Sequence, residues 1–144
     1  MPEREIEVRP ARDEDADEVW PLARDFATSF APRRGEFDAT WRGLVGDADA
    51  LLVVAETGGR VVGYLLAHCH LTFLANGPVA WVEEVMVDER HRRSGVGRDL
   101  MGAAEAWALE RGAAYVALAS RRAGPFYVAL GYADSATFFK KSLT

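Results

Sequence analysis

The sequence predicts a single α/β (α+β) domain with a mixed β-sheet, antiparallel in its N-terminal half and parallel around a central helix, with about four flanking helices. Two observations support this. Apolar segments between residues 50 and 87 are joined by links too short for a crossover, so their strands are antiparallel. From residue 79 onward, the order strand, helix, strand predicts a right-handed parallel connection. With 144 residues, the chain is expected to form one domain, residues 1–144.

The N-terminal third predicts an edge strand and two helices. Residues 5–9 alternate in polarity and end at Pro10, which predicts the strand. Asp13 is a candidate N-cap for a helix from about Glu14. The apolar stripe of this helix is Val19, Leu22, Ala23, Phe26 and Phe30. A shorter helix is predicted within residues 36–47, with Phe37, Trp41, Leu44 and Val45 on one side.

The middle of the chain predicts three strands. Within residues 50–73, two β-branched and apolar runs flank Gly58 and Gly59, which supply the positive φ angles of a tight turn. The segment Ala-Asn-Gly-Pro at residues 75–78 predicts the next turn, and residues 79–87 the next strand.

The C-terminal part predicts a long helix from about Gly95 to Arg111, ended by Gly112. A strand is expected within residues 113–120, and a short helix follows with Pro125 in its first turn. The buried side of the long helix is predicted to carry Val96, Leu100, Ala103, Ala104 and Trp107. A last strand is predicted within residues 136–143.

The composition indicates a globular chain with a formal net charge of −5. This charge argues against general nucleic-acid binding and favours cationic partners, although it also serves solubility. The one cysteine, Cys69, leaves no internal disulfide, and the N-terminal segment has no apolar signal core. No apolar run is long enough to span a bilayer. We therefore expect a soluble, cytoplasmic protein with neither a nucleic-acid nor a membrane partner.

The segment HRRSGVG, residues 91–97, predicts an anion-binding loop at the start of the long helix. Gly95 and Gly97 have no Cβ, so an anion can approach the backbone amides, and the helix N-terminus adds partial positive charge. Formal positive charge comes from Arg92, Arg93 and Arg98. A phosphate or diphosphate is the expected ligand, and an ordinary charged loop is the alternative.

Three familiar kinds of phosphate-binding segment match this loop less well. The nucleotide P-loop pattern G-x-x-x-x-G-K-[ST] does not occur. The dinucleotide pattern G-x-G-x-x-G begins at Gly95 but has Leu100 in place of its third glycine, and it would follow antiparallel strands. A nucleic-acid patch at residues 90–93 is disfavoured because Asp88 and Glu89 adjoin it.

The segment VDERHRRSGVGRDLM resembles the acyl-CoA motif [QR]-x-x-G-x-[GA] of the GNAT superfamily of N-acetyltransferases. Arg92, Gly95 and Gly97 fill its positions, and Val87 ends the strand before it. FYVALGY, residues 126–132, resembles the family segment FY-x-x-x-G-[FY]. The order of elements extends the resemblance over nearly the whole chain, which is also loosely similar to the aminoalkylphosphonate N-acetyltransferases. It implies a GNAT-like fold and an acetyl-CoA-dependent N-acetyltransferase.

The resemblance also implies how acetyl-CoA is bound. Its pantetheine arm would pair with the strand backbone at Val85–Val87, whose side chains also pack in the core. Amides of Arg93–Arg98 would hold the diphosphate. Ser120 stands where many members have an asparagine that contacts the cofactor. The implied cofactor-binding residues are Val85, Met86, Val87, Arg92, Arg93, Ser94, Gly95, Val96, Gly97, Arg98, Ser120 and Tyr127.

Acetyl transfer requires a neutral amine, stabilisation of an oxyanion and a proton for the departing thiolate. The resemblance implies that Tyr127 donates this proton or hydrogen-bonds the sulfur. The backbone amide of Val85 or Met86 would bind the oxyanion. The segment before Tyr127 is short and contains Pro125, so the position of the tyrosine depends on the turn formed there.

Glu83 and Glu84 are the general-base candidates, because carboxylates in an apolar strand are costly to bury unless they are paired or functional. Side-chain alternation predicts that the two point to opposite faces, so that one reaches the substrate. Glu83 matches an active-site glutamate of the polyamine acetyltransferases and ranks first. A salt bridge to an arginine and proton removal by water are the alternatives.

His68 and His70 alternate onto one face of a strand, but without a third ligand they do not predict a metal site. They are candidates for the acceptor pocket, with Phe73 near its mouth. Cys69 points to the opposite side and is expected in the core.

The predicted function is transfer of an acetyl group to a primary amine of a small molecule, directly, in a ternary complex with acetyl-CoA. The acceptor is open among polyamines, amino acids, aminoglycosides and protein N-termini. The alternative is a non-catalytic acyl-CoA-binding or sensing module. Dimers are common in the family, so the resemblance makes a homodimer a candidate assembly.

Overall fold

The computed structural model describes residues 5–144. The elements of this part of the chain are β1 (Glu7–Pro10), the 3₁₀ helix η1 (Asp13–Asp15), α1 (Ala16–Phe26), α2 (Arg34–Val45), β2 (Ala50–Thr57), β3 (Arg60–Thr72), β4 (Gly77–Val87), the 3₁₀ helix η2 (Glu89–His91), α3 (Val96–Glu110), β5 (Val116–Leu118) and α4 (Gly124–Ala129). No helix within the described range is long and apolar enough to cross a bilayer.

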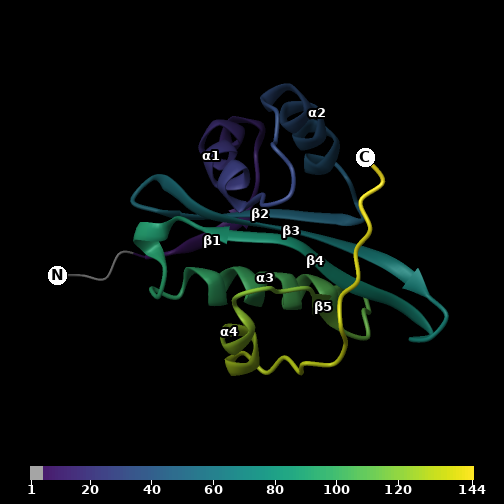
Figure 1. Ribbon diagram of the computed structural model, residues 1–144. Helices are drawn as coiled ribbons and strands as arrows, with labels where there is room; N and C mark the ends of the chain where they lie inside the picture. Colours follow the sequence, from purple (N-terminus) through teal and green to yellow (C-terminus); the bar gives the residue numbers. More distant parts are fainter. Residues whose placement is uncertain (1–4) are drawn as a thin grey trace.

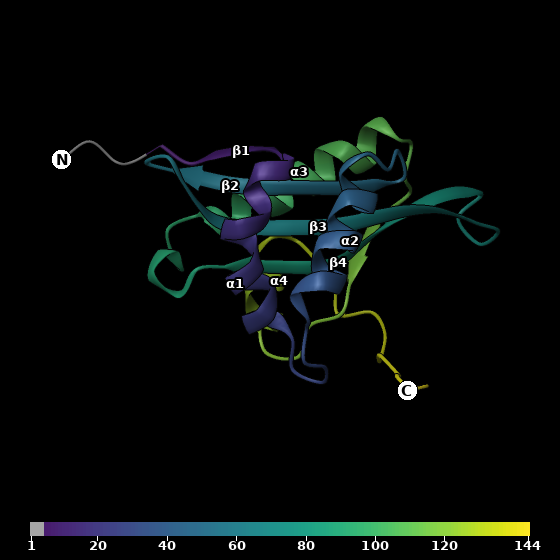
Figure 2. The same ribbon diagram turned by 90° about the horizontal axis from the view of Figure 1, so that it is seen from above.

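The strands form one sheet in the order β1-β2-β3-β4-β5. Neighbours are antiparallel from β1 to β4, whereas β4 and β5 are parallel and connected through α3. Helices α1 and α2 cover one face of the sheet, and α3 and α4 lie on the other (Figures 1 and 2). The predicted mixed sheet with its parallel crossover is confirmed.

An apolar cluster lies on each face of the sheet. The α3-side cluster consists of Val53, Ala55, Val62, Leu65, Ala67, Val82, Val96, Leu100, Met101 and Ala104. The α1-side cluster consists of Val19, Leu22, Trp41, Val54, Val61 and Tyr64. Consecutive residues such as Val53 and Val54 pack into different clusters, because strand side chains alternate between the faces.

The first hairpin turn has the predicted backbone geometry, whereas the second covers residues 73–76 and not the predicted 75–78. Gly58 and Gly59, between β2 and β3, have φ angles of 60° and 77°. Between β3 and β4, Asn76 has a φ of 58°. A short polar side chain tolerates this left-handed conformation better than a bulky one does. The first turn places β2 beside β3, and the second places β3 beside β4 over nearly their full length.

The start of α1 differs from the prediction of an N-cap at Asp13. The 3₁₀ helix η1 comes first, and Asp15 stabilises it. Asp15 Oδ2 accepts the backbone N–H of Arg12 at 2.8 Å, and the Arg9 guanidinium binds both carboxylate oxygens at 2.7 and 2.9 Å. Arg9 also donates to Glu56 on β2 at 2.7 Å. The buried ion pair therefore fixes the first helical layer to the sheet.

The end of α1 also differs from the prediction of an apolar stripe through Phe30. The helix ends at Phe26, and Ala27 is extended with a ψ of 131°. The helix does not continue because residues 27–32 contain Thr, Ser and Pro, which disfavour helix. Phe30 therefore lies outside the helix and is 62% exposed. The second predicted helix is confirmed as α2, with Trp41 buried.

The last predicted strand, within residues 136–143, is wrong. Residues 133–144 form no helix or strand, and Phe139 is 86% exposed. β5 pairs with β4 at only three positions, so it offers a short ladder to a further strand. The terminal segment instead passes from the α4 side of the sheet to the α1 side (Figure 1), where Lys140 Nζ donates to Ser29 Oγ at 3.3 Å.

Candidate active site

One edge of β4 is unpaired over its C-terminal half. Within the described residues, pairing with β5 ends at Val82 and Leu118, whereas β4 continues to Val87. Along this stretch β3 pairs with the other edge of β4, from Gly63 to Leu66. The two parallel strands thus separate after Val82, and backbone groups of β4 face the opening.

The groups that face this opening can be assigned from the ladder. Asp88 N–H donates to Val62 O at 2.7 Å, so the backbone of Asp88 faces β3. Successive residues of an antiparallel strand point their N–H and C=O groups to alternate sides. Met86 therefore also faces β3, whereas Val85 and Val87 face the opening. Of the two amides predicted to bind an oxyanion, only that of Val85 is directed there.

The side chains of these three residues pack as the sequence predicts. Val85 and Val87 contact the α3-side cluster, and Met86 contacts the α1-side cluster. The stretch is therefore both a core strand and a free backbone edge.

The loop between η2 and α3 has the geometry of an anion site. Arg93 and Gly95 have φ angles of 66° and 90°, and Ser94 Oγ donates to His91 O. The first helical bond of α3 runs from Asp99 N–H to Gly95 O at 3.0 Å. The amides of residues 96–98 therefore have no acceptor within the helix. A 15-residue helix adds partial positive charge at the same point.

The two glycines of the loop are needed for different reasons. Gly95 has the left-handed φ that a residue with a side chain adopts only under strain. A Cβ on Gly97 would lie 3.1 Å from Phe126 Cζ, so this glycine admits the ring of α4 as well as an approaching anion. Phe126 belongs to the segment FYVALGY, but the sequence did not predict its contact with the loop.

The predicted cationic and polar side chains differ in their contacts and exposure. Arg92 Nε donates to Val87 O at 3.2 Å, and its guanidinium lies 3.8 Å from Met86 Sδ, so Arg92 runs along the free edge of β4. Arg93 and Arg98 are exposed. Ser120 Oγ accepts the backbone N–H of Ala123 at 3.0 Å and so stabilises the turn before α4.

Tyr127 lies on α4 and packs against the α3-side cluster. Its ring is edge-on to Phe126 at 5.0 Å and to Tyr132 at 6.0 Å between centroids. Burial raises the pKa of Tyr127 above its ordinary value, so its hydroxyl keeps its proton at neutral pH. Pro125 is accommodated in the first turn of α4 as predicted.

The two glutamates of β4 lie at a β-bulge. Leu66 pairs with Glu84, and Ala67 pairs with Val82, so Glu83 is an extra residue without a partner on β3. Val82 packs under α3, whereas Glu84 reaches Tyr64 on the opposite face. Unbroken alternation would place residues 82 and 84 on the same face. The expectation of regular alternation through Glu83 and Glu84 is therefore wrong.

Glu84 is half-buried and accepts the Tyr64 hydroxyl at 2.7 Å, whereas Glu83 is exposed. Sequence reasoning missed Tyr64. The available signal was a tyrosine in an otherwise apolar strand segment, but the bulge that turns Glu84 to the face of Tyr64 could not be read from the residues.

The histidines lie further along β3. His68 pairs with Trp81 and His70 with Val79, and Phe73 is fully exposed at the tip of the hairpin. Within residues 5–144, no three His, Cys, Asp or Glu side chains cluster as metal ligands. Cys69 is half-buried and unpaired by any disulfide.

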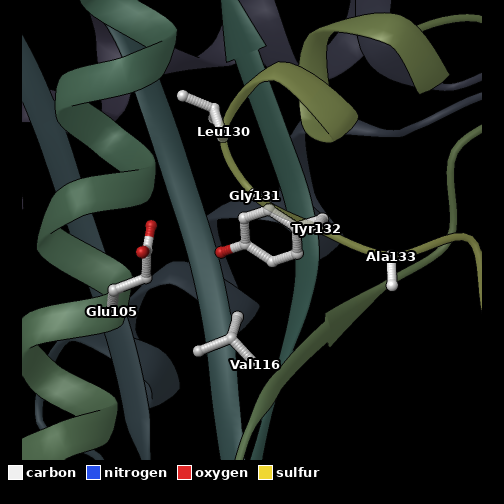
Figure 3. Close-up of a pocket in the computed structure, with 6 residues that line it drawn as sticks. All are labelled: Glu105, Val116, Leu130, Gly131, Tyr132 and Ala133. Atoms are coloured by element: carbon white, nitrogen blue, oxygen red, sulfur yellow. The ribbon is translucent and has the colours of Figure 1, made fainter.

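Two cavities lie on the α3 side. The one in Figure 3, of about 290 Å³, is lined by Glu105, Val116, Leu130, Gly131, Tyr132 and Ala133, and none of these residues was predicted to be functional. The other, of about 690 Å³, lies beside the start of α3 and contains Ser94, Val96 and Arg98 of the predicted loop. Thr57 and His91 also line it.

The sequence matches the profile described as the Acetyltransferase (GNAT) family over residues 14–132. No curated protein sequence is similar enough to this chain to count as a relative.

Several solved structures share the fold. A transcriptional regulator from Bacillus halodurans superposes with a TM-score of 0.85 at 23% identity, covering 96% of this chain and 100% of its own. Glucosamine-6-phosphate N-acetyltransferase from Arabidopsis thaliana gives 0.86 at 19% identity, with 97% and 99% covered. An aminoglycoside N-acetyltransferase in complex with CoA gives 0.85 at 17% identity, with 100% and 99% covered. At these identities the likeness is one of fold.

Proposed function

Because the chain belongs to the GNAT family of acetyltransferases, which use acetyl-CoA as donor, we propose that it acetylates a primary amine of a small molecule by direct transfer in a ternary complex. The observation that carries this proposal is the free edge of β4, which leads from Val85 to the unsatisfied amides at the start of α3. An extended donor with amide groups at one end and a diphosphate at the other is complementary to this surface.

The donor would bind mainly through the backbone. The outward N–H and C=O groups of Val85 and Val87 would pair with the pantetheine amides, Arg92 having to release the Val87 carbonyl. The amides of residues 93–98 would hold the diphosphate, with charge from the three arginines of the loop. Ser120, in the turn before α4, and Tyr127, on α4, would complete the donor site.

The reaction would then use the Val85 amide, the Tyr127 hydroxyl and an acceptor for the proton of the amine. The amine nitrogen attacks the thioester carbonyl, and the Val85 amide donates to the oxyanion that develops. As the C–S bond breaks, the Tyr127 hydroxyl protonates the thiolate, and it is later reprotonated from water. The amine loses its own proton to Glu83, to Glu84 or to water. The products are the acetamide and CoA with a free thiol.

The names of two structural neighbours support a small-molecule acceptor, because glucosamine 6-phosphate and aminoglycosides both carry amino groups. His68 and His70 are proposed to line the acceptor side. A homodimer and a cytoplasmic location stay predictions from the sequence.

Thiol release from acetyl-CoA across a panel of polyamines, amino sugars, amino acids and peptides tests the proposal. Turnover with a small amine, reduced in Tyr127→Phe, is the expected result. Binding of acetyl-CoA without thiol release for any amine would instead favour an acyl-CoA-binding module. Failure to bind acetyl-CoA or CoA in calorimetry would overturn both.

A further inference from the structure

Tyr64 places a hydroxyl inside an otherwise apolar layer. Its side chain is 3% exposed and packs in the α1-side cluster with Val19 and Trp41. A buried hydroxyl lowers stability unless it is hydrogen-bonded, and phenylalanine would fill nearly the same space. The Tyr64 hydroxyl donates to Glu84 Oε1 at 2.7 Å. The hydroxyl therefore has a specific partner, and that partner is an acid.

Glu84 is in an unusual position for a carboxylate. It is half-buried, and among the described residues no Lys, Arg or His forms an ion pair with it. The bulge at Glu83 turns it from the α3 face to the α1 face, next to the point where β4 and β5 separate. One oxygen is bonded to Tyr64, and the other has no hydrogen-bond partner within residues 5–144. A partly desolvated anion of this kind favours a cation from outside.

The tyrosine can only donate in this pair. Burial and the adjacent Glu84 carboxylate raise the pKa of Tyr64 far above its ordinary value, so the proton stays on the phenol. The hydrogen bond thus orients Glu84 without neutralising it. A salt bridge to lysine or arginine in the same place would have neutralised the charge.

We propose that Tyr64 is a positioning residue, which holds Glu84 so that its free oxygen binds the acceptor as an ammonium ion and takes one proton from it. This inference rests on the proposed acetyl transfer and names its acceptor class, an amine that is cationic at neutral pH. The ammonium N–H bond breaks, Glu84 becomes a carboxylic acid, and the neutral amine keeps its lone pair for attack. Glu84 then returns the proton to water. In this arrangement Tyr64 contacts neither the amine nor acetyl-CoA, and Glu84 instead of Glu83 is the base.

Double-mutant cycles test this pair on the full-length chain. Tyr64→Phe keeps the ring, so we expect kcat/KM for the amine to fall about 10-fold while the Kd for acetyl-CoA is unchanged. Glu84→Gln is expected to lose about 100-fold or more. The double variant Tyr64→Phe/Glu84→Gln should be no worse than Glu84→Gln alone. In a Glu83→Gln background, Tyr64→Phe should still cost its full factor of about 10.

The controls separate positioning from folding. Tyr115→Phe removes a hydroxyl from an exposed tyrosine and should change neither stability nor kinetics. Equal, additive losses from Tyr64→Phe in the Glu84→Gln and Glu83→Gln backgrounds would overturn the inference and leave acetyl transfer intact. A stronger coupling of Tyr64 with Glu83 would also overturn it. A wild-type protein that binds acetyl-CoA but acetylates no amine would refute the proposed function, and the catalytic role of the pair with it.

Discussion

The two sides of β4 are built from different parts of the polypeptide. At the opening between β4 and β5 and at the start of α3 (together the α3 side), the candidate binding groups are backbone groups, namely the free edge at Val85 and Val87 and the amides of residues 96–98. On the side that faces α1, they are side chains, with Glu84 held by Tyr64. A backbone site requires a strand end, a helix start and small residues, whereas a side-chain site depends on where each side chain is turned.

This difference predicts which substitutions affect which side. The α3 side should tolerate changes of side-chain chemistry but not the addition of a Cβ at its glycines. The α1 side should be sensitive to single polar atoms, even where the shape of the residue is preserved.

The largest effect is expected at Gly97. A Cβ on Gly97 would lie 3.1 Å from Phe126 Cζ, so the methyl groups of Gly97→Val collide with this ring. They would also occupy the space through which the diphosphate is proposed to approach. We expect acetyl-CoA affinity to fall by more than about 100-fold in calorimetry, because overpacking and loss of anion access act together. Gly102→Ala is the matched control in the same helix, since its Cβ meets nothing within 4 Å. Unchanged affinity in Gly97→Val would mean that the donor does not bind at this loop.

A catalytic effect without a binding effect is expected at Tyr127. Tyr127→Phe keeps the aromatic contacts of α4 but removes the proton donor, so kcat should fall about 100-fold while the Kd for acetyl-CoA changes little. Because burial raises the pKa of Tyr127, wild-type kcat should not fall between about pH 7 and 9 through loss of this proton. A fall of kcat within that range that is absent from Tyr127→Phe would contradict the raised pKa, whereas full turnover in Tyr127→Phe would contradict the assignment of Tyr127 as proton donor.

The contrast between the two sides also explains what the sequence could predict. The antiparallel connection of β2, β3 and β4, the glycine turn at Gly58 and Gly59, and the start of α3 follow from short links, periodicity and glycines, which act locally. The backbone geometry of the loop before α3 is local in the same sense, since Gly95 and the helix that follows it are adjacent in the chain. These features were predictable because the backbone carries both the signal and the geometry.

Features that depend on distant partners were predicted poorly. The bulge at Glu83 is a property of the register between β3 and β4, and no residue type or pattern in β4 predicts it. The segment of residues 136–143 contains the β-favouring Thr137, Phe138 and Phe139, yet it lacks a partner long enough to pair with. For the same reason Tyr64 was missed, because its hydrogen bond to Glu84 forms only once the bulge has turned Glu84 to the same face.

The ion pair of Asp15 offers a test that perturbs the α1 layer alone. Asp15→Ala removes the carboxylate that binds Arg9, whose side chain is only 12% exposed, and should lower the free energy of unfolding by about 2 kcal/mol. The hydrogen bond from Arg9 holds the pKa of Asp15 below its ordinary value. Its contribution is therefore complete above the unfolded pKa of about 3.9 and is lost as the pH falls through the lower folded pKa.

Urea unfolding of wild type and Asp15→Ala at about pH 7 and pH 3 measures this contribution. The difference between the two proteins should be smaller at the acidic pH, and Asp15→Ala should keep its acetyl-CoA affinity, because Asp15 lies on the α1 side of the sheet. A lower affinity for acetyl-CoA in Asp15→Ala would show that the two sides are not independent.

The smallest effect is expected at Gly95, in the loop where the proposed binding groups are backbone amides. A Cβ there would meet only the mobile end of Arg98, 3.3 Å away, so the cost of Gly95→Ala comes from its φ of 90° and amounts to about 1 kcal/mol. Gly112→Ala carries the same kind of strain, at a φ of 73° with nothing within 4 Å, but at the far end of α3. Both variants should lose similar stability in urea unfolding, yet only Gly95→Ala should also bind acetyl-CoA about 5-fold more weakly. If Gly112→Ala weakened acetyl-CoA binding equally, the loss would reflect general destabilisation, and the loop geometry at Gly95 would have no particular part in holding the donor.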